Sequence, residues 1–244
     1  MRNMRTLIFV LTISISSVQA QDAKFTEVWR PEPRTVLPGK SPSDAPADAI
    51  VLLNGNDLSQ WENVSDKKTI KWRSGDNAMT VIKGGGNIQT KQSFGDCQLH
   101  IEWRTPAEVK ASGQNRGNSG IFFMSRYELQ VLDSYGNRTY SNGQAGSIYK
   151  QHIPLVNASK APGEWQTYDV IFTAPRFNAD SSVKSPARIT VFQNGILVQN
   201  NVEIIGSTSN VGIAHYIPHP EKLPLMLQDH GDEVSFRNVW VREL

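Results

Sequence analysis

The sequence predicts an all-β protein in which two antiparallel sheets pack as a jelly-roll β-sandwich. From Ile50 onward, apolar residues recur at every second position between clusters of turn residues, which is the pattern of half-buried strands. Asn194-Gly195 marks a two-residue hairpin, because both residues tolerate a positive φ. Convincing helical periodicity is absent from the sequence, and the alternative of a β-propeller lacks the blade repeat that this fold requires.

In chain order, the strands are alternating runs bounded by Gly, Pro, Asn or Asp. The triplet Gly84-Gly85-Gly86 is expected to form a tight turn, and it does not resemble a phosphate-binding loop because no helix follows it. The expected strands are residues 50–53, 70–73, 78–82, 87–90, 94–105, 119–125, 127–133, 147–151, 165–173, 187–193, 196–202, 225–228 and 234–242.

Residues 1–20 are expected to be an export signal that is removed from the mature chain. Arg2 and Arg5 give a positive start, residues 7–15 are apolar, and small residues precede a cleavage site after Ala20. So short an apolar run does not span a bilayer comfortably, which disfavours the alternative of an N-terminal membrane anchor. We therefore expect a periplasmic or extracellular protein whose mature chain does not insert into a membrane.

Residues 21–48 are expected to be a Pro-rich leader, and residues 49–244 a single domain. Removal of two arginines with the signal leaves 25 − 2 basic residues against 23 acidic ones, so the mature chain is close to neutral. No basic cluster is present, so nucleic acid and anionic membranes are poor candidates as partners. The lone Cys97 cannot form an internal disulfide, and we expect it to be a small packed residue.

The strand near residues 98–104 has one apolar and one polar side. Leu99, Ile101 and Trp103 are expected in the core. The opposite side is either a solvated sheet face or the wall of a glycan cleft. Its members are Gln98, His100, Glu102 and Arg104.

The strand near residues 127–133 keeps Glu128 and Gln130 on one side, with Asp133 near its end. Burying carboxylates and amides costs free energy unless they are paired, so this face is either solvated or lines a polar cleft. Glu102 and Glu128 could supply the carboxylate pair of a glycosidase, at a distance that the sequence does not give. The three-carboxylate strand of familiar jelly-roll glucanases is missing, which disfavours simple double displacement.

Two further segments carry side chains that can transfer protons. Tyr149, Lys150 and His152 lie at the end of an expected strand, and Gln228-Asp229-His230 forms a polar tip before the last strand. Trp165 is either a core residue or a platform that stacks on a sugar, and its polar neighbours Glu164 and Gln166 favour the position at the cleft.

Other common catalytic patterns are excluded. The chain has no Gly-x-Ser-x-Gly elbow for Ser-His-Asp catalysis. His215 and His219 are four residues apart, but Pro218 and Pro220 break the helix that would bring them together around zinc.

Eight ordered blocks between Ala49 and Leu244 closely resemble the 3-keto-disaccharide hydrolase family. The blocks are LLNGNDLSQW (52–61), LHIEWRTP (99–106), GNSGIFF (117–123), YELQVLDS (127–134), GSIYKQ (146–151), PGEWQTYDVIFTAPRF (162–177), VFQNGILVQNNVE (191–203) and LQDHG with VSFRNVWVREL (227–244).

The resemblance implies a concanavalin-like jelly roll that acts on oxidised glycosides in exporting bacteria. It does not imply which residues catalyse. Two less typical segments, residues 111–116 and 207–223, are expected to set substrate choice.

A ketone at C3 of a sugar acidifies the proton at C2, so the family activity suggests elimination followed by hydration. This route needs a base, a group that stabilises the oxyanion and an acid for the leaving oxygen. Glu128 or His152 is the candidate base. Arg104, Gln130 or a bound divalent cation is the candidate for stabilising the oxyanion. Glu102, Tyr149 or His230 is the candidate acid. Further expected substrate contacts are Asn118, Arg126, Asp133, Lys150, Trp165, Gln228 and Asp229.

Two other functions remain open from the sequence: a non-catalytic carbohydrate-binding module and a structural protein of the cell envelope. Jelly rolls serve both catalysis and binding, so the fold does not decide. The polar rows favour an enzyme with a small carbohydrate substrate, because a binding module tends to expose flat aromatic platforms. The sequence does not indicate the metal or the oligomeric state.

Overall fold

The structure, a computed structural model, describes residues 23–244, and the expected export signal at residues 1–20 lies outside them. The chain divides into two units, Met1–Thr35 and Val36–Leu244. The described part of the first unit begins with one 3₁₀ turn, η1 (Ala23–Thr26), and is irregular after it. No helix among the described residues is long and apolar enough to cross a membrane.

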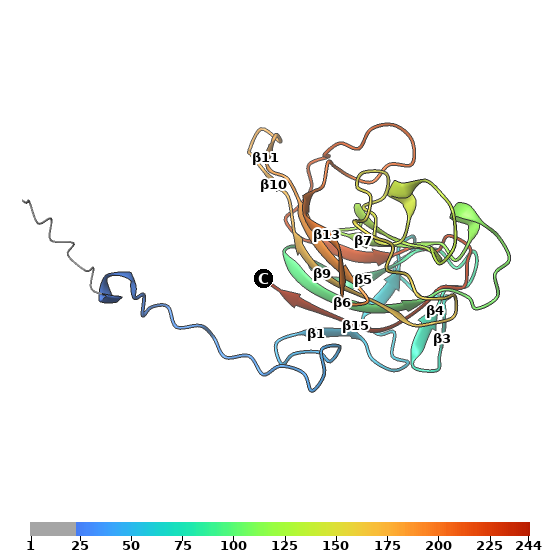
Figure 1. Cartoon of the computed structure of the whole chain (residues 1–244), viewed down its shortest axis with the longest axis horizontal. Coiled ribbons are helices and arrows are strands. Elements are labelled where there is room, and N and C mark those ends of the chain that lie inside the picture. The colour runs from blue at the N-terminus through green and yellow to red at the C-terminus, as the bar shows by residue number, and fades with distance from the viewer. Residues whose placement is uncertain (1–22) are drawn as a thin grey trace, which may run out of the picture. The chain divides into compact units, whose positions relative to one another are not determined.

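The second unit is a sandwich of two antiparallel sheets (Figure 1). The larger sheet has eight strands in the order β13-β12-β9-β6-β15-β4-β3, with β1 also paired to β15. Its strands are β1 (Ile50–Leu53), β3 (Arg73–Gly75), β4 (Ala78–Thr80), β6 (Cys97–Arg104), β9 (Gln166–Thr173), β12 (Arg188–Gln193), β13 (Ile196–Glu203) and β15 (Ser235–Glu243).

The smaller sheet has five strands in the order β2-β5-β14-β7-β8. Its strands are β2 (Trp61–Asn63), β5 (Ile88–Phe94), β7 (Ser119–Phe123), β8 (Tyr127–Val131) and β14 (Leu223–Leu227). A separate pair, β10 (Arg176–Phe177) and β11 (Val183–Ser185), forms a short hairpin, and two 3₁₀ turns, η2 (Gly113–Asn115) and η3 (Ser141–Gly143), lie in loops.

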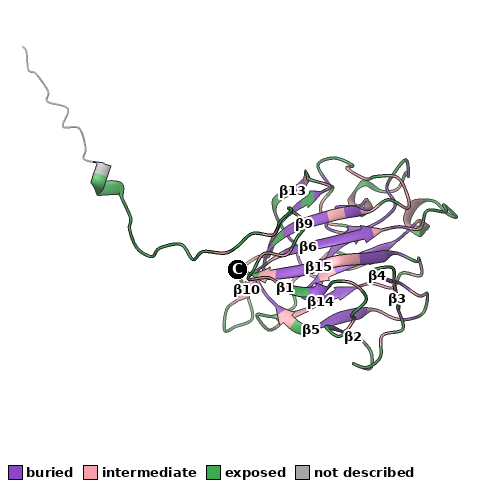
Figure 2. Ribbon diagram, turned by 90° about the horizontal axis from the view of Figure 1, so that it is seen from below, coloured by how far each residue is buried: buried purple, intermediate pink, exposed green. Residues whose placement is uncertain are grey.

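The core lies between the two sheets. Phe123 and Tyr127 on the smaller sheet pack their rings against Phe172 on the larger one, at centroid distances of 4.8 and 5.9 Å. Leu99 and Ile101 are fully buried on the same inner side of β6. Figure 2 shows the long strands β9, β6 and β15 as largely buried. The predicted all-β, jelly-roll sandwich is confirmed.

Most predicted strands are present within a few residues of their expected bounds. The Asn194-Gly195 hairpin is confirmed, because both residues have positive φ, at 53° and 78°. The expected strand at residues 147–151 is wrong: the Gln151 and His152 amides both donate to the Ile148 carbonyl, which coils this segment into turns. The strands β2, β10 and β11 were not predicted, and each is only two or three residues long.

Strand alternation gives each sheet an outer face with its own polar residues. On β6, the inward side of Leu99 and Ile101 leaves Glu102 on the outer face of the larger sheet. On β8, the inward side of Tyr127 and Leu129 leaves Glu128 on the outer face of the smaller sheet. The two outer faces look away from each other across the core.

Candidate active site

A cleft of about 300 Å³ lies on the outer face of the smaller sheet. Strands supply its floor, and three loops supply its walls. The lining residues are Asn118, Phe122, Glu128, Gln130, Tyr149, Thr208, Asn210, Gln228 and His230.

Strand register places Glu128 in the floor of this cleft. Phe122 on β7 lies opposite Glu128 on β8, and Gly120 lies opposite Gln130. Gln228, just after β14, joins this floor because its amide donates to the Gly120 carbonyl over 3.0 Å. Along β7 and β8, on either side of the turn at residues 124–126, period-two alternation therefore sends every second residue into the core and the others toward the cleft.

Two loop segments are attached directly to the backbone of Glu128 and form one wall. The Glu128 amide donates to Thr208 Oγ1 over 3.0 Å, and the Tyr149 amide donates to the Glu128 carbonyl over 3.2 Å. The Lys150 ammonium donates to Asn210 Oδ1 over 2.9 Å, which ties the two loops to each other. The wall is thus fixed relative to the carboxyl group that it faces.

Asp229 shapes the polar tip that carries His230. Its carboxylate accepts hydrogen bonds from the amides of Gly86 and Gly231, at 2.9 and 3.0 Å. Its own amide donates to Asn87 Oδ1 over 2.9 Å. These bonds hold the tip against the glycine turn at residues 84–86 and leave the exposed His230 at the cleft.

Glu128 has the electrostatic properties of an acid–base group. Its residue surface is only 5% exposed, and burial raises the pKa of its carboxyl from an ordinary 4.5 to about 8. No basic side chain pairs with it among the described residues. A carboxyl group whose pKa is near neutrality can both accept and return a proton at physiological pH.

Gln130 and Tyr149 place hydrogen-bond donors beside Glu128. In one orientation of its amide, Gln130 donates to Glu128 Oε1 over 3.2 Å. The Tyr149 hydroxyl lies 2.6 Å from the Tyr140 hydroxyl. Burial, that hydrogen bond and the nearby charge of Glu128 raise the pKa of Tyr149 above its ordinary 10.0, so it remains a protonated donor.

The cleft brings together six of the residues that the sequence predicts for the site. Glu128, Tyr149 and His230 are three of the five side chains expected as base or acid. Gln130 was expected to stabilise the oxyanion, and Asn118 and Gln228 were expected to contact substrate.

The expected pairing of Glu102 with Glu128 is wrong, because the two project from opposite faces of the sandwich. Glu102 accepts hydrogen bonds from Arg237 Nε at 2.6 Å and Asn238 Nδ2 at 3.0 Å. The His100 imidazole, these hydrogen bonds and the Arg237 charge outweigh burial and lower the pKa of Glu102 to about 2. This carboxylate is an ion-pair partner and has no proton to donate near neutral pH.

Arg104 and Trp165 also lie outside the cleft, and the expectation that Trp165 stacks on a sugar there is wrong. The guanidinium carbons of Arg104 and Arg237 stand 4.6 and 4.1 Å from the centre of the Trp165 ring. The indole therefore stacks on cations on the outer face of the larger sheet. Arg104 therefore does not stabilise an oxyanion in the cleft, and that expected role is wrong.

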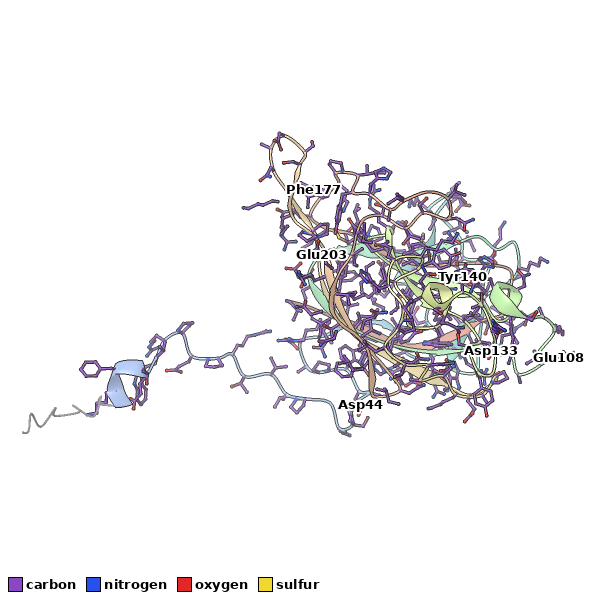
Figure 3. The ribbon with its side chains drawn as sticks, turned by 45° about the horizontal axis from the view of Figure 1, so that its top comes forward. Asp44, Glu108, Asp133, Tyr140, Phe177 and Glu203 are labelled. Atoms are coloured by element: carbon purple, nitrogen blue, oxygen red, sulfur yellow. The ribbon has the colours of Figure 1, made fainter. Side chains whose placement is uncertain are left out.

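His152 does not reach the cleft either. Its Nε2 donates to the Glu203 carbonyl over 2.6 Å. The coiled segment from Tyr149 to His152 leaves the His152 side chain outside the cleft lining. Asp133 is also separate: it is buried and paired with Arg116 Nε at 2.7 Å. Figure 3 shows Glu203 and Asp133 at opposite ends of the domain.

Three other residues that were expected to contact substrate support the walls of the cleft without lining it. Lys150 and Asp229 hold the loops described above, and Arg126 accepts a hydrogen bond at its carbonyl from the Thr208 amide over 2.8 Å. None of the three lines the cleft. They orient the wall and the tip that carry the lining residues.

Sequence reasoning missed Phe122, Thr208 and Asn210. The position of Phe122 was predictable, because its neighbours Ile121 and Phe123 point into the core and alternation then points Phe122 to the outer face. Thr208 and Asn210 lie in the irregular segment between β13 and β14, where no periodic pattern indicates direction.

The residues present do not fit a protein-built metal centre. Among residues 23–244, no group of three or more His, Cys, Asp or Glu side chains is arranged to hold a metal ion. The cleft lining supplies one carboxyl group and one imidazole. The cleft lining therefore does not supply a ligand set for the divalent cation considered from the sequence.

Comparison with known proteins places this architecture in a family. A crystal structure from Parabacteroides distasonis ATCC 8503, named as that of "a putative glycosyl hydrolase", is 47% identical, with a TM-score of 0.87 and coverage of 91% of this chain and 97% of that one. A second structure of the same name and organism is 18% identical, with a TM-score of 0.60 and coverage of 81% and 94%, and shows the fold alone.

No curated protein matches the chain significantly. Residues 48–242 match the family described as the 3-keto-alpha-glucoside-1,2-lyase-like domain. This match spans nearly all of the domain that carries the cleft, so the resemblance predicted from the sequence is confirmed and the chain belongs to the 3-keto-α-glucoside-1,2-lyase-like family.

Proposed function

We propose that the cleft around Glu128 cleaves the C1 glycosidic bond of 3-keto-glucosides by elimination and then adds water. The observation that carries this proposal is the buried carboxyl group of Glu128, whose pKa is about 8. Family membership makes the chain carbohydrate-active, and it names a 1,2-lyase as the reference activity. The hydrolase name of the 47% identical relative agrees with elimination followed by hydration.

Glu128 is the base of the proposed reaction. Its ionised carboxylate takes the C2 proton, which the C3 ketone has acidified, and the electrons of the C2–H bond give an enediolate. Gln130 and Tyr149 supply hydrogen-bond donors next to Glu128, where the oxyanion at C3 would form. The enediolate then collapses, a C1–C2 double bond forms and the C1–O bond breaks.

His230 is the acid that protonates the departing oxygen. It is the exposed imidazole at the cleft, and an imidazolium can give its proton to an alkoxide leaving group. Water then adds across the double bond, with hydroxyl at C1 and hydrogen at C2, and releases the 3-keto-sugar. The sum is hydrolysis without a covalent enzyme intermediate.

The lining favours a neutral sugar. No Lys or Arg belongs to the lining, and Glu128 is mostly protonated at pH 7. The amides of Asn118, Gln130, Asn210 and Gln228 offer donors and acceptors to hydroxyl groups. A uronate would enter this cleft without a lysine or arginine partner, at a cost in desolvation.

The competing function is a non-catalytic carbohydrate-binding module. Binding neutral hydroxyl groups does not require an unpaired buried carboxyl group, and such burial costs free energy. The raised pKa of Glu128 therefore favours catalysis over binding alone.

Methyl 3-keto-α-glucoside tests the reaction in deuterium oxide. We expect methanol release, exchange of the C2 proton and transient absorbance of the conjugated enone, with Glu128→Gln at least 100-fold slower. The folded state of the variant is checked by circular dichroism. Full turnover by folded Glu128→Gln contradicts the role of Glu128, and a wild-type protein that binds the sugar without turnover supports the binding module.

We also propose that the protein is exported, because residues 1–20 have the pattern of a cleavable signal. Amino-terminal sequencing of the protein from its native cells should begin at Gln21. A mature chain that retains Met1 contradicts this proposal.

A further inference from the structure

The orientation of the Gln130 amide decides whether Glu128 faces a hydrogen-bond donor or an acceptor. We propose that Gln114 is a positioning residue, which holds this amide so that its oxygen faces Glu128 and accepts a hydrogen bond from the protonated carboxyl group. This inference rests on the proposed function, because it concerns the protonation of the proposed base. Gln114 lies on the 3₁₀ turn η2, outside the lining of the cleft.

The Gln130 amide lies between two pairs of oxygen atoms, and distance alone does not fix its orientation. On one side, its Nε2 stands 3.2 Å from Gln114 Oε1 and 3.3 Å from Asn118 Oδ1. On the other side, its Oε1 stands 3.2 Å from Glu128 Oε1 and 3.3 Å from the Ser119 carbonyl oxygen. Turning the amide over exchanges its two ends, so one pair always meets the NH₂ group and the other pair meets the oxygen.

Backbone carbonyl groups fix the orientation of both neighbours on the first side. Gln114 Nε2 donates to the Gly143 carbonyl over 2.8 Å, which leaves Gln114 Oε1 facing Gln130. Asn118 Nδ2 donates to the Gln114 carbonyl over 2.6 Å, which leaves Asn118 Oδ1 facing Gln130. A carbonyl group only accepts hydrogen bonds, so neither neighbour can turn its own amide over without losing a bond. This side therefore requires the NH₂ group of Gln130.

Glu128 then faces the oxygen of Gln130. With Glu128 protonated, this orientation gives the Gln130 amide three hydrogen-bond partners and one contact between two acceptor oxygens, at the Ser119 carbonyl. With Glu128 ionised, the opposite orientation gives the amide two partners and two such contacts. Gln130 is 1% exposed, and a buried acceptor without a partner costs free energy. Gln114 thus favours the protonated form of Glu128, and the opposite orientation belongs to the ionised form that acts as the base.

Charge does not account for the protonated form of Glu128 within residues 23–244. The titratable and charged groups in the lining, and beside it in the wall and the tip, are Tyr149, Lys150, Asp229 and His230. The strand β7 and the segment around Thr208 face Glu128 with uncharged residues. Burial is the cause of the raised pKa of Glu128, and an acceptor supplied by Gln130 acts in the same direction.

The test follows the protonation of Glu128 directly, without a substrate. In protein labelled with ¹³C at the glutamate Cδ atoms, the chemical shift of this carbon reports the loss of the carboxyl proton, and Glu128→Gln identifies the signal by its absence. Gln114→Met removes the amide of residue 114 at a similar side-chain length. Thr139→Val is the matched control, because it removes the other partner of Gln114 Nε2, 3.1 Å away, and leaves the bond to Gly143 in place.

We expect the Glu128 carboxyl group to titrate near pH 8 in the wild type, about one pH unit lower in Gln114→Met, and at the wild-type value in Thr139→Val. The bend in the pH profile of kcat/KM for methyl 3-keto-α-glucoside should move by the same amount. Circular dichroism checks the fold of each variant, and Gln114→Ala replaces Gln114→Met in the same measurement if the methionine disturbs the fold.

A titration of Glu128 in Gln114→Met that matches the wild type overturns the positioning role of Gln114. A shift in Thr139→Val as large as that in Gln114→Met overturns it as well, because loosening of the turn then explains both. The proposed function fails separately: if the titrations are as expected but the wild type does not turn over the methyl glycoside, the positioning role stands. A wild-type Glu128 that titrates near 4.5 overturns the positioning role, and turnover then decides the proposed function by itself.

Discussion

Gly120 and Glu128 lie on neighbouring strands, so close that a Cβ atom on Gly120 would stand 2.6 Å from Glu128 Oε1. The same atom would stand 2.7 Å from Phe122 Cε2. The missing side chain at residue 120 thus provides the space that the Glu128 carboxyl group occupies. The sequence element GNSGIFF contains this glycine for a packing reason at the site, because its φ is not in the left-handed region.

Replacement of Gly120 by alanine should damage catalysis more than folding. The atoms that must yield are the ends of the Glu128 and Phe122 side chains, which can rotate away without moving the backbone. We expect Gly120→Ala to lower kcat/KM for methyl 3-keto-α-glucoside by about 10- to 100-fold, since a small displacement of a catalytic group has effects of this size.

Gly75→Ala is the matched control, because a Cβ atom there would meet nothing within 4 Å. Both variants should unfold in urea within about 1 kcal/mol of the wild type. Gly120→Ala with wild-type kcat/KM would show that the position of the Glu128 carboxyl group does not matter to turnover.

The activity should follow the ionisation of Glu128. The base must be a carboxylate, and its pKa of about 8 means that only a minority of molecules carry it at pH 7. We expect kcat/KM to rise about tenfold per pH unit below pH 7 and to bend near pH 8. A profile that is flat between pH 6 and pH 8 contradicts Glu128 as the base.

Stability should report the same group without any substrate. The folded pKa of about 8 lies above the ordinary 4.5, so the folded state binds more protons than the unfolded state between these values, and stability falls as pH rises through this window. Glu128→Gln has no such titration. The free energy of unfolding of Glu128→Gln minus that of the wild type should therefore increase between pH 4.5 and pH 8, by at most about 1.4 kcal/mol per pH unit.

Urea unfolding of both proteins at pH 4.5 and pH 8 measures this gain, and titrations elsewhere in the chain cancel in the difference. Equal pH dependence in the two proteins would mean that the carboxyl group of Glu128 is not buried in its uncharged form. If Glu128→Gln is more stable than the wild type and also inactive, the buried carboxyl group lowers the stability of the protein and is needed for catalysis.

Period-two alternation was enough to predict the sandwich and to place Glu128 and Gln130 on one face of β8. Alternation also separated Glu102 from Leu99 correctly, but it does not say which of two sheets a strand joins or which way an outer face looks. The pairing of Glu102 with Glu128 failed for that reason. Asn210 could not be predicted at all, since its position depends on hydrogen bonds between loops that are 60 residues apart in the chain.

A network of charged side chains on the outer face of the larger sheet should contribute to stability and not to turnover. Its members are Asp169, His100, Glu102 and Arg237. Burial alone would lower the pKa of His100, but the carboxylates of Asp169, 2.6 Å from its Nδ1, and of Glu102 raise it to about 9. A raised histidine pKa means stability that is complete below 6.5 and is lost as pH rises through 9. For Glu102, with a pKa of about 2, the contribution is complete above 4.5 and is lost as pH falls through 2.

Glu102→Gln therefore should lower the free energy of unfolding at pH 6 by roughly 2–4 kcal/mol, because it leaves Arg237 and His100 without this carboxylate in a partly buried site. Its kcat/KM should stay within about twofold of the wild type, since the cleft lies on the other face of the sandwich. Urea unfolding and steady-state kinetics on the same preparation measure both. A stable, inactive Glu102→Gln protein would place this carboxylate in the reaction after all.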